Sequence, residues 1–182
     1  MKVLHLGWSV WNEGQQLSTA RPESRWSYYW QGRRTGQMPF AGTGKAAMDV
    51  LKEYVFEEVR RSDFKAAPSR QRCLFAFPPQ VLREDEAVAT LESMALVRSP
   101  TVQAFWKKGV WKVLMELELA GGAVHIGDSK LLDCSHLTVE QIETEAGKYW
   151  RGEGNTDELL YEGPFRVTRM VKSFEPQVLA PR

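Results

Sequence analysis

Apolar spacing predicts one long helix, and a capping signal predicts a second. Between residues 45 and 61 apolar residues recur every three or four positions, the pattern of an amphipathic helix. Its apolar face is expected to hold Ala47, Val50, Leu51, Tyr54, Val55 and Val59. The residues expected to point outward are mostly charged, namely Lys52, Glu53, Glu57, Glu58, Arg60 and Arg61. A second helix is predicted at 138–150, because Thr138 and Gln141 have the spacing of a capping box.

Shorter apolar segments between turn residues predict strands. They lie at 2–6, 73–77, 110–119, 123–127, 158–161 and 165–171. The segment at 73–77 is continuously apolar and ends at two prolines, so we expect a central strand there. A short helix is predicted at 84–94, an irregular connection at 9–25 and a loose tail at 173–182. These elements predict an α+β fold in a single domain, residues 1–172.

Length and charge narrow the class of protein. The 182 residues are 43% hydrophobic, enough for one domain with a sizeable core. Lys and Arg total 24 against 23 Asp and Glu, so no global positive field indicates nucleic-acid binding. Two cysteines are too few for a disulfide framework, which favours a reducing, cytoplasmic location. No signal-peptide core or membrane-length apolar run is present, so we expect no membrane association.

Several catalytic and metal motifs find no support in the sequence. The glycines and lysine at 42–45 lack the spacing of a phosphate-binding loop. His5, His125 and His136 offer no pair at zinc-ligand spacing, and Cys134 adds only a Cys-x-His, so no metal site is expected. No Gly-x-Ser-x-Gly elbow occurs, and covalent acyl transfer is not indicated.

One acid stands at the start of a covered strand. Glu158 precedes the contiguous apolar residues 159–161, where a carboxylate is costly without a role or a partner. The alternative is that Glu158 belongs to the polar loop at 152–157 and is merely solvated. Local sequence leaves both interpretations open. Glu162, just before a Gly-Pro turn, is the second choice for a catalytic acid.

A basic and aromatic run at 24–34 precedes a glycine-rich segment at 32–44 that is typical of a binding loop. Its rings and arginines are suited to stacking on bases and binding phosphates, so a nucleic-acid target is one possibility. The aromatic residues Tyr28, Tyr29 and Trp30 are as well explained by a place in the core.

Separated motifs resemble one superfamily, the NAD-dependent ADP-ribosyltransferases. The chain is most similar to a bacterial and phage domain family of unknown function that is grouped with them, and the resemblance spans residues 2–171. The matching features are a strand carrying His at 4–6, a helix running into Pro-Ser-Arg at 56–70, an apolar strand at 73–77, Lys-Tyr-Trp-Arg-Gly-Glu at 148–153 and a Glu-led final strand at 158–167.

The resemblance implies an ADP-ribosyltransferase-like fold, a split, mixed and mostly antiparallel sheet whose cleft holds NAD+ as substrate. Glu158 would bind the 2′-hydroxyl of the nicotinamide ribose and stabilise an oxocarbenium-like transition state. His5, as in the His-Tyr-Glu branch, would hydrogen-bond a ribose hydroxyl, although a lone histidine is more often structural. Backbone groups after it, at Leu6, would clamp the nicotinamide amide.

Further cofactor contacts follow from the same resemblance. Tyr29 would stack on nicotinamide, with Tyr28 and Trp30 as alternatives. Ser69 and Arg70 would lie at the pyrophosphate, Arg70 as a fork donor. A structural arginine that ties down the loop is the alternative for Arg70.

The implied function is transfer of ADP-ribose from NAD+ to a macromolecule, protein or nucleic acid, by a bacterial toxin, phage-defence protein or phage effector. A toxin would have a neutralising antitoxin or immunity protein as partner. One departure is His-Leu-Gly at 5–7, where many relatives have His-Gly or His-Thr, and no clear Ser-Thr-Ser or Tyr marks the second strand. An NAD+ glycohydrolase and a non-catalytic binding module of the same fold therefore stay open as alternatives.

Overall fold

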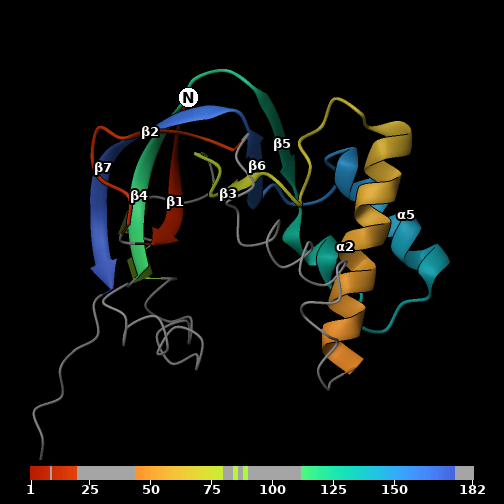
Figure 1. Ribbon diagram of the computed structural model, residues 1–182. Helices are drawn as coiled ribbons and strands as arrows, with labels where there is room; N and C mark the ends of the chain where they lie inside the picture. The colour runs from red at the N-terminus through yellow and green to blue at the C-terminus, as the bar shows by residue number, and fades with distance from the viewer. Residues whose placement is uncertain (9, 20–43, 80–83, 86–87, 90–111, 175–182) are drawn as a thin grey trace, which may run out of the picture. The chain divides into compact units, whose positions relative to one another are not determined.

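A computed structural model describes residues 1–8, 10–19, 44–79, 84–85, 88–89 and 112–174 (Figure 1). These residues form helices and antiparallel sheets, which confirms the α+β class. The chain divides into two compact units, each built from separate stretches of sequence. The first comprises 1–17, 79–120 and 165–182, and the second comprises 18–78 and 121–164. No helix in the described residues is long and apolar enough to cross a membrane.

The first unit contains a four-stranded sheet in the order β1-β4-β7-β2. Its strands are β1 (Lys2–Trp8), β4 (Lys112–Leu119), β7 (Pro164–Phe174) and β2 (Gln16–Ser18). β1 and β4 pair antiparallel, and β4 pairs antiparallel with β7 through two irregularities in register. The predicted strands at 2–6, 110–119 and 165–171 are therefore confirmed, with somewhat different ends.

Strand β4 shows why this sheet forms. Leu117 and Leu119 are buried, while Glu116 and Glu118 alternate with them on the more open face. Each of these acids has a cross-strand cation, since Lys2 Nζ lies 2.9 Å from Glu116 and an Arg166 nitrogen lies 2.5 Å from Glu118. The alternation of leucine and glutamate therefore gives this end of β4 one buried apolar face and one charged, more exposed face.

Two expectations at the ends of these segments are wrong. Residues 16–18, expected to be irregular, form β2. The sequence does not predict this strand, because three residues with one apolar side chain are too few to show periodicity. The expected tail at 173–182 begins too early, since Phe174 is still paired with Lys112. Residues 175–182 lie outside the described residues, as does most of the predicted helix at 84–94.

The second unit contains a three-stranded sheet in the order β3-β6-β5. Its strands are β3 (Leu74–Ala76), β6 (Glu158–Glu162) and β5 (Ala123–Gly127), and both pairs are antiparallel. The middle strand is β6, whose three central residues are fully buried. The prediction of a central strand at 73–77 is wrong for the described sheet, where β3 lies at the edge. A continuous apolar run reports that a strand is covered on both faces, and does not fix its place in the sheet.

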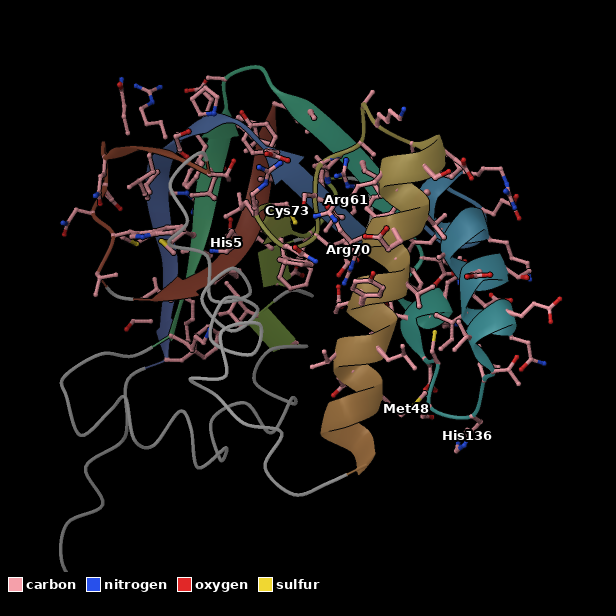
Figure 2. All side chains as sticks on the ribbon, turned by 45° about the vertical axis from the view of Figure 1, so that its right-hand side comes forward. His5, Met48, Arg61, Arg70, Cys73 and His136 are labelled. Carbon is pink, nitrogen blue, oxygen red and sulfur yellow. The ribbon has the colours of Figure 1, made fainter. Side chains whose placement is uncertain are left out.

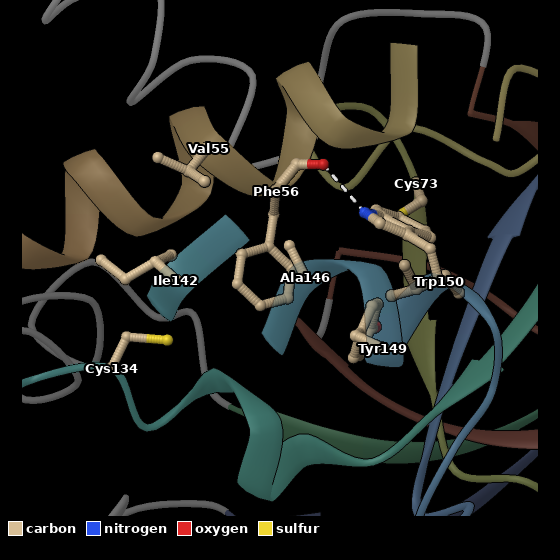
Figure 3. Close-up of a cluster of buried hydrophobic side chains, with 9 residues drawn as sticks. Val55, Phe56, Cys73, Cys134, Ile142, Ala146, Tyr149 and Trp150 are labelled. Carbon is tan, nitrogen blue, oxygen red and sulfur yellow. Dashed lines mark hydrogen bonds between the residues drawn. The ribbon is translucent and has the colours of Figure 1, made fainter. Parts of the chain in front are cut away.

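The helices α2 (Gly44–Asp63) and α5 (Val139–Trp150) pack on a common core, with the short 3-10 helix η2 (Ser129–Leu132) nearby in sequence. Figure 3 shows this core, in which the indole nitrogen of Trp150 donates a 2.8 Å hydrogen bond to the Phe56 carbonyl. The buried members are Val55, Phe56, Cys73, Cys134, Ile142, Ala146, Tyr149, Trp150 and Leu160. Tertiary packing thus joins the two helices to the middle strand of the sheet.

The buried face of α2 differs from the predicted one. Tyr54, expected inside, is 53% exposed, while Phe56 is fully buried. Glu53 and Glu57, expected outside, are only 4% and 2% exposed. Apolar spacing failed here because the two acids have buried partners elsewhere in the chain, which offset the cost of removing their charges from water.

The start of α5 agrees with prediction. Thr138 is the N-cap, and its hydroxyl accepts a 3.3 Å hydrogen bond from the Gln141 amide. The Gln141 side chain accepts a 2.9 Å hydrogen bond from the Thr138 amide, so both halves of the capping box are present.

Replacing the cap tests its contribution. Thr138→Ala should lower the free energy of unfolding by about 1 kcal/mol, because it leaves a helix-end amide without its acceptor. Thr144→Ala is the matched control. It removes a hydroxyl from the same helix, and that hydroxyl donates to the Glu140 carbonyl and caps no helix end. Urea denaturation of both variants should show a loss only for Thr138→Ala, and equal losses would contradict the assignment.

Candidate functional site

Three side chains from separate elements meet at the start of β6. Arg70 Nη1 donates hydrogen bonds to Glu158 Oε2 at 2.6 Å and to the Tyr149 hydroxyl at 2.7 Å. The Tyr149 hydroxyl in turn donates to the same Glu158 oxygen at 2.5 Å. Glu158 Oε2 is thus held by two donors, while no described residue donates to its Oε1. The Glu158 side chain remains 17% exposed.

Arg70 lies beside α2, as Figure 2 shows. Its side chain is 4% exposed, and it donates from Nε to Glu53 Oε2 at 3.0 Å and from Nη2 to Glu53 Oε1 at 3.2 Å. This is a fork-to-fork pair. Burial by itself lowers the pKa of Arg70, but the Glu53 and Glu158 carboxylates outweigh burial and raise that pKa well above its ordinary value. The guanidinium is therefore a permanent positive charge.

Tyr149 supplies a neutral donor from the last turn of α5. Burial raises its pKa far above the ordinary value for a phenol, so its hydroxyl keeps the proton that it donates to Glu158. Its ring packs edge-on against Phe56 and Trp150. A Cβ added at Gly127 would lie 2.5 Å from the Tyr149 ring, so the close approach of the ring requires glycine there.

The turn that carries Arg70 is fixed at a second point. Ser69 Oγ lies 3.1 Å from the Glu57 carboxylate, to which it donates, and the Ser69 amide donates to Glu162 Oε2 at 3.0 Å. Arg60 also holds Glu57 with two hydrogen bonds, of 3.1 and 2.8 Å. Adjacent residues of one turn are thus bonded to acids one helical turn apart on α2.

The loop before Glu158 is also held by hydrogen bonds. The Asp157 carboxylate accepts bonds from the amide and hydroxyl of Ser129, at 2.7 and 2.6 Å. Asp128, which is 6% exposed, accepts a 2.8 Å bond from the Asn155 amide. Glu158 itself is the first residue of β6, opposite Gly127. The alternative that Glu158 is merely solvated within a polar loop is therefore wrong.

The other predicted residues fall in different parts of the chain. His5 lies in β1 of the first unit, where its ring stacks on Trp11 with centroids 5.1 Å apart. Leu6 is next to it, opposite Leu114. Tyr29 lies outside the described residues, as do Tyr28 and Trp30. Because His5 and Glu158 belong to different units, a shared role for them stays a prediction.

The contacts of Arg70 bear on the two interpretations of this residue. Its guanidinium is occupied by Glu53, Tyr149 and Glu158, which favours the alternative of an arginine that ties down its loop. Ser69 is likewise bonded to Glu57 and Glu162. Binding of the pyrophosphate by Ser69 and Arg70 stays a prediction.

Sequence reasoning missed Glu53 and Tyr149 as members of this cluster. Tyr149 was noted only as part of a family motif, although it lies nine residues before Glu158. Glu53 follows the charged pattern of an outward helix face. The available signal was the pair of acids four residues apart at 53 and 57, flanking the buried Phe56.

Comparison with known proteins identifies a family. A family model described as "Protein of unknown function (DUF2441)" matches residues 37–173. The chain belongs to this family. The DUF2441 match includes Glu53, Arg70, Tyr149 and Glu158, whereas His5 lies before it. No curated protein matches the chain.

A half-buried histidine contacts the ring of Tyr149. The ring of His125, in β5, is 5.0 Å from the Tyr149 ring and 4.8 Å from the Trp150 ring. Burial lowers the pKa of His125, partly opposed by a hydrogen bond with the Tyr149 backbone. Its Nε2 is buried and has no hydrogen-bond partner among the described residues. The folded protein therefore favours the neutral imidazole.

The Arg70–Glu53 pair should behave as a unit in stability measurements. Arg70→Met leaves Glu53 buried without its cation, so the free energy of unfolding should fall by about 3–5 kcal/mol. The double variant Arg70→Met/Glu53→Met should recover much of this loss, because apolar side chains of similar volume replace both charges. Urea denaturation of the single and double variants measures the coupling.

An exposed pair provides the control for this cycle. Arg166 and Glu118 have side chains that are 52% and 43% exposed. Arg166→Met should change the free energy of unfolding by only about 0–1 kcal/mol, because water screens the pair. A similar loss in Arg70→Met and Arg166→Met would contradict a special role for burial.

His125 should make the fold sensitive to acid. Its folded-state pKa is below the unfolded value of about 6.5, so below that pH the unfolded chain binds the proton more readily. The contribution of neutral His125 to the free energy of unfolding is complete above about pH 6.5, and it is lost as the pH falls toward the pKa of His125 in the folded state. His125→Phe should lose less stability than wild type between pH 8 and pH 5 in urea denaturation. Equal losses would count against this assignment.

Proposed function

We propose that this chain is an NAD+-dependent ADP-ribosyltransferase in which Glu158 is the catalytic carboxylate. The observation that carries the proposal is the state of Glu158: one oxygen is fixed by Arg70 and Tyr149, and the other receives no bond from the described residues. A fixed, partly exposed carboxylate at the start of a covered strand suits a reaction that develops positive charge on a bound sugar.

The proposed reaction requires a negative charge close to C1′ of the nicotinamide ribose. The bond between the ribose C1′ and the nicotinamide nitrogen breaks, and its electron pair leaves with nicotinamide as a neutral molecule. Positive charge then spreads over C1′ and the ring oxygen, and the Glu158 carboxylate stabilises it and accepts a hydrogen bond from the 2′-hydroxyl. A nucleophilic group of the acceptor attacks C1′ and loses its proton, which completes the transfer.

The remaining parts of the proposal rest on the resemblance of the sequence. The separation of the strands into two antiparallel sheets supports an ADP-ribosyltransferase-like fold. In that fold His5 would bind a ribose hydroxyl and Leu6 the nicotinamide amide, with Tyr29 against nicotinamide and Ser69 and Arg70 toward the pyrophosphate. The acceptor would be a protein or a nucleic acid. A cytoplasmic toxin, phage-defence protein or phage effector with a neutralising partner is the proposed context.

A single pair of variants tests the proposal. Wild type, Glu158→Gln and Glu162→Gln are incubated with NAD+ labelled in the ADP-ribose part and a whole-cell lysate, which is then separated into protein, DNA and RNA. Wild type should label one fraction, and Glu158→Gln should label it about a hundredfold more slowly, because an electrostatic stabiliser of the transition state is lost. Glu162→Gln, a matched change on the same strand, should retain most of the activity.

Other results of this experiment would favour one of the alternative functions. Nicotinamide release without a labelled fraction would indicate an NAD+ glycohydrolase. Loss of activity in Glu162→Gln alone would move the catalytic role to Glu162. No label and no nicotinamide release from folded wild type, as judged by circular dichroism, would refute the enzyme and favour the non-catalytic binding module.

A further inference from the structure

The contact between Arg70 and Glu158 creates an electrostatic conflict for the proposed reaction. A guanidinium nitrogen 2.6 Å from the carboxylate fixes its position but also cancels its negative charge. The oxocarbenium-like ribose needs that charge, and would be repelled by Arg70 at nearly the same distance. An arginine alone would therefore position Glu158 and weaken it.

Glu53 removes this conflict. It binds Arg70 through both oxygens, at 3.0 and 3.2 Å, and the side chains of both residues are 5% exposed or less. The two opposite charges are within hydrogen-bonding distance and form a pair of zero net charge, whose effect on Glu158 water screens only weakly in so dry a place. The charges of Arg70, Glu53 and Glu158 then sum to one negative charge.

The net negative charge is accessible at Glu158, whereas Glu53 is buried. Both oxygens of Glu53 accept bonds from Arg70 within the core. Glu158 is 17% exposed, and its Oε1 receives no hydrogen bond from the described residues. Tyr149 adds a second bond to Oε2 without adding charge, because its phenol stays protonated.

Other ionisable groups around Glu158 do not alter this balance. Burial raises the pKa of the Cys73 thiol and lowers the pKa of His125, so both are neutral near pH 7. Glu162, on the same strand, has its own cation in Arg72 at 3.2 Å.

We propose that Glu53 is a positioning residue, which neutralises Arg70 so that Arg70 and Tyr149 can fix Glu158 without cancelling its charge. This inference rests on the proposed function. Glu53 acts through Arg70 and does not touch the substrate.

The test is the pH dependence of NAD+ cleavage in Glu53→Gln. The amide keeps the size of the side chain but leaves the charge of Arg70 uncompensated beside Glu158. The rate constant kcat should fall on the order of tenfold, as expected for one unit charge several ångströms away in a partly buried site. In a plot of kcat against pH, the fall on the acid side (the acid limb) should also move to lower pH, because the uncompensated charge of Arg70 opposes protonation of Glu158. Glu53→Asp, which keeps the charge, should restore the wild-type position of the limb.

Glu57→Gln is the matched control. Glu57 lies one helical turn from Glu53 and is equally buried, but its carboxylate is bonded to Arg60 and Ser69, and no hydrogen bond or ion pair joins it to Arg70 in the described part of the chain. Its acid limb should coincide with that of wild type. A fall in kcat for Glu53→Gln with an unmoved limb would overturn the proposal and leave Glu53 a structural residue.

Two measurements keep the test independent of folding and of enzyme activity. Should Glu53→Gln fail to fold, Arg70→Met/Glu53→Met removes both charges together with the Arg70 hydrogen bond to Glu158, so its acid limb should lie at higher pH than that of wild type. In Arg70→Met alone, which leaves Glu53 in place, the limb should lie higher still, and coincident limbs of these two variants would overturn the proposal. NMR titration of the labelled Glu158 carboxyl needs no turnover, and its midpoint should move to lower pH in Glu53→Gln. An unchanged midpoint refutes the role of Glu53, whereas a shifted midpoint without NAD+ cleavage refutes only the proposed function.

Discussion

The buried guanidinium of Arg70 is the constraint on which the second unit depends. A charge that is 4% exposed is tolerated only when its hydrogen-bond donors and its charge are satisfied nearby. Those partners come from three elements: Glu53 of α2, Tyr149 of α5 and Glu158 of β6. Satisfying one side chain therefore fixes two helices and the middle strand of the sheet at a single point.

The same constraint holds the carboxylate of Glu158 in one position. Glu53 and Glu57 bind Arg70 and Ser69, which are adjacent in one turn, so α2 holds that turn at two successive points. Ser129 and Gly127 hold the loop that enters β6. In the proposed reaction, a carboxylate positioned in this way would not have to lose the conformational freedom that a solvated acid loses, which is the condition for electrostatic stabilisation of a transition state.

Local features could be predicted from the sequence, and long-range pairings could not. The capping box of α5 and the bounds of β5 depend on residues close together in the chain. The burial of Glu53 depends on a partner 17 residues away, and that of Glu158 on Arg70, 88 residues away. Apolar periodicity therefore placed Glu53 outside and Tyr54 inside, because it counts a carboxylate as polar whether or not a cation neutralises it. The place of Glu158 before a covered strand made it a candidate and left its role open, and its partners could not be predicted.

Differences in exposure and pairing among Glu53, Glu57, Glu158 and Glu162 favour Glu158 as the carboxylate of the proposed reaction. Glu53 and Glu57 are bound through both oxygens and lie in the core, so neither can reach a substrate. Glu162 is 27% exposed, and its cation Arg72 is 60% exposed, so water screens both charges. Glu158 combines a partly open carboxylate with a buried guanidinium and a buried phenol, whereas the buried donor to Glu162 is the neutral amide of Ser69. In the proposed reaction the charge of Glu158 would act on a bound ribose from the edge of a medium of low dielectric, where a carboxylate stabilises a developing cation more strongly than in water.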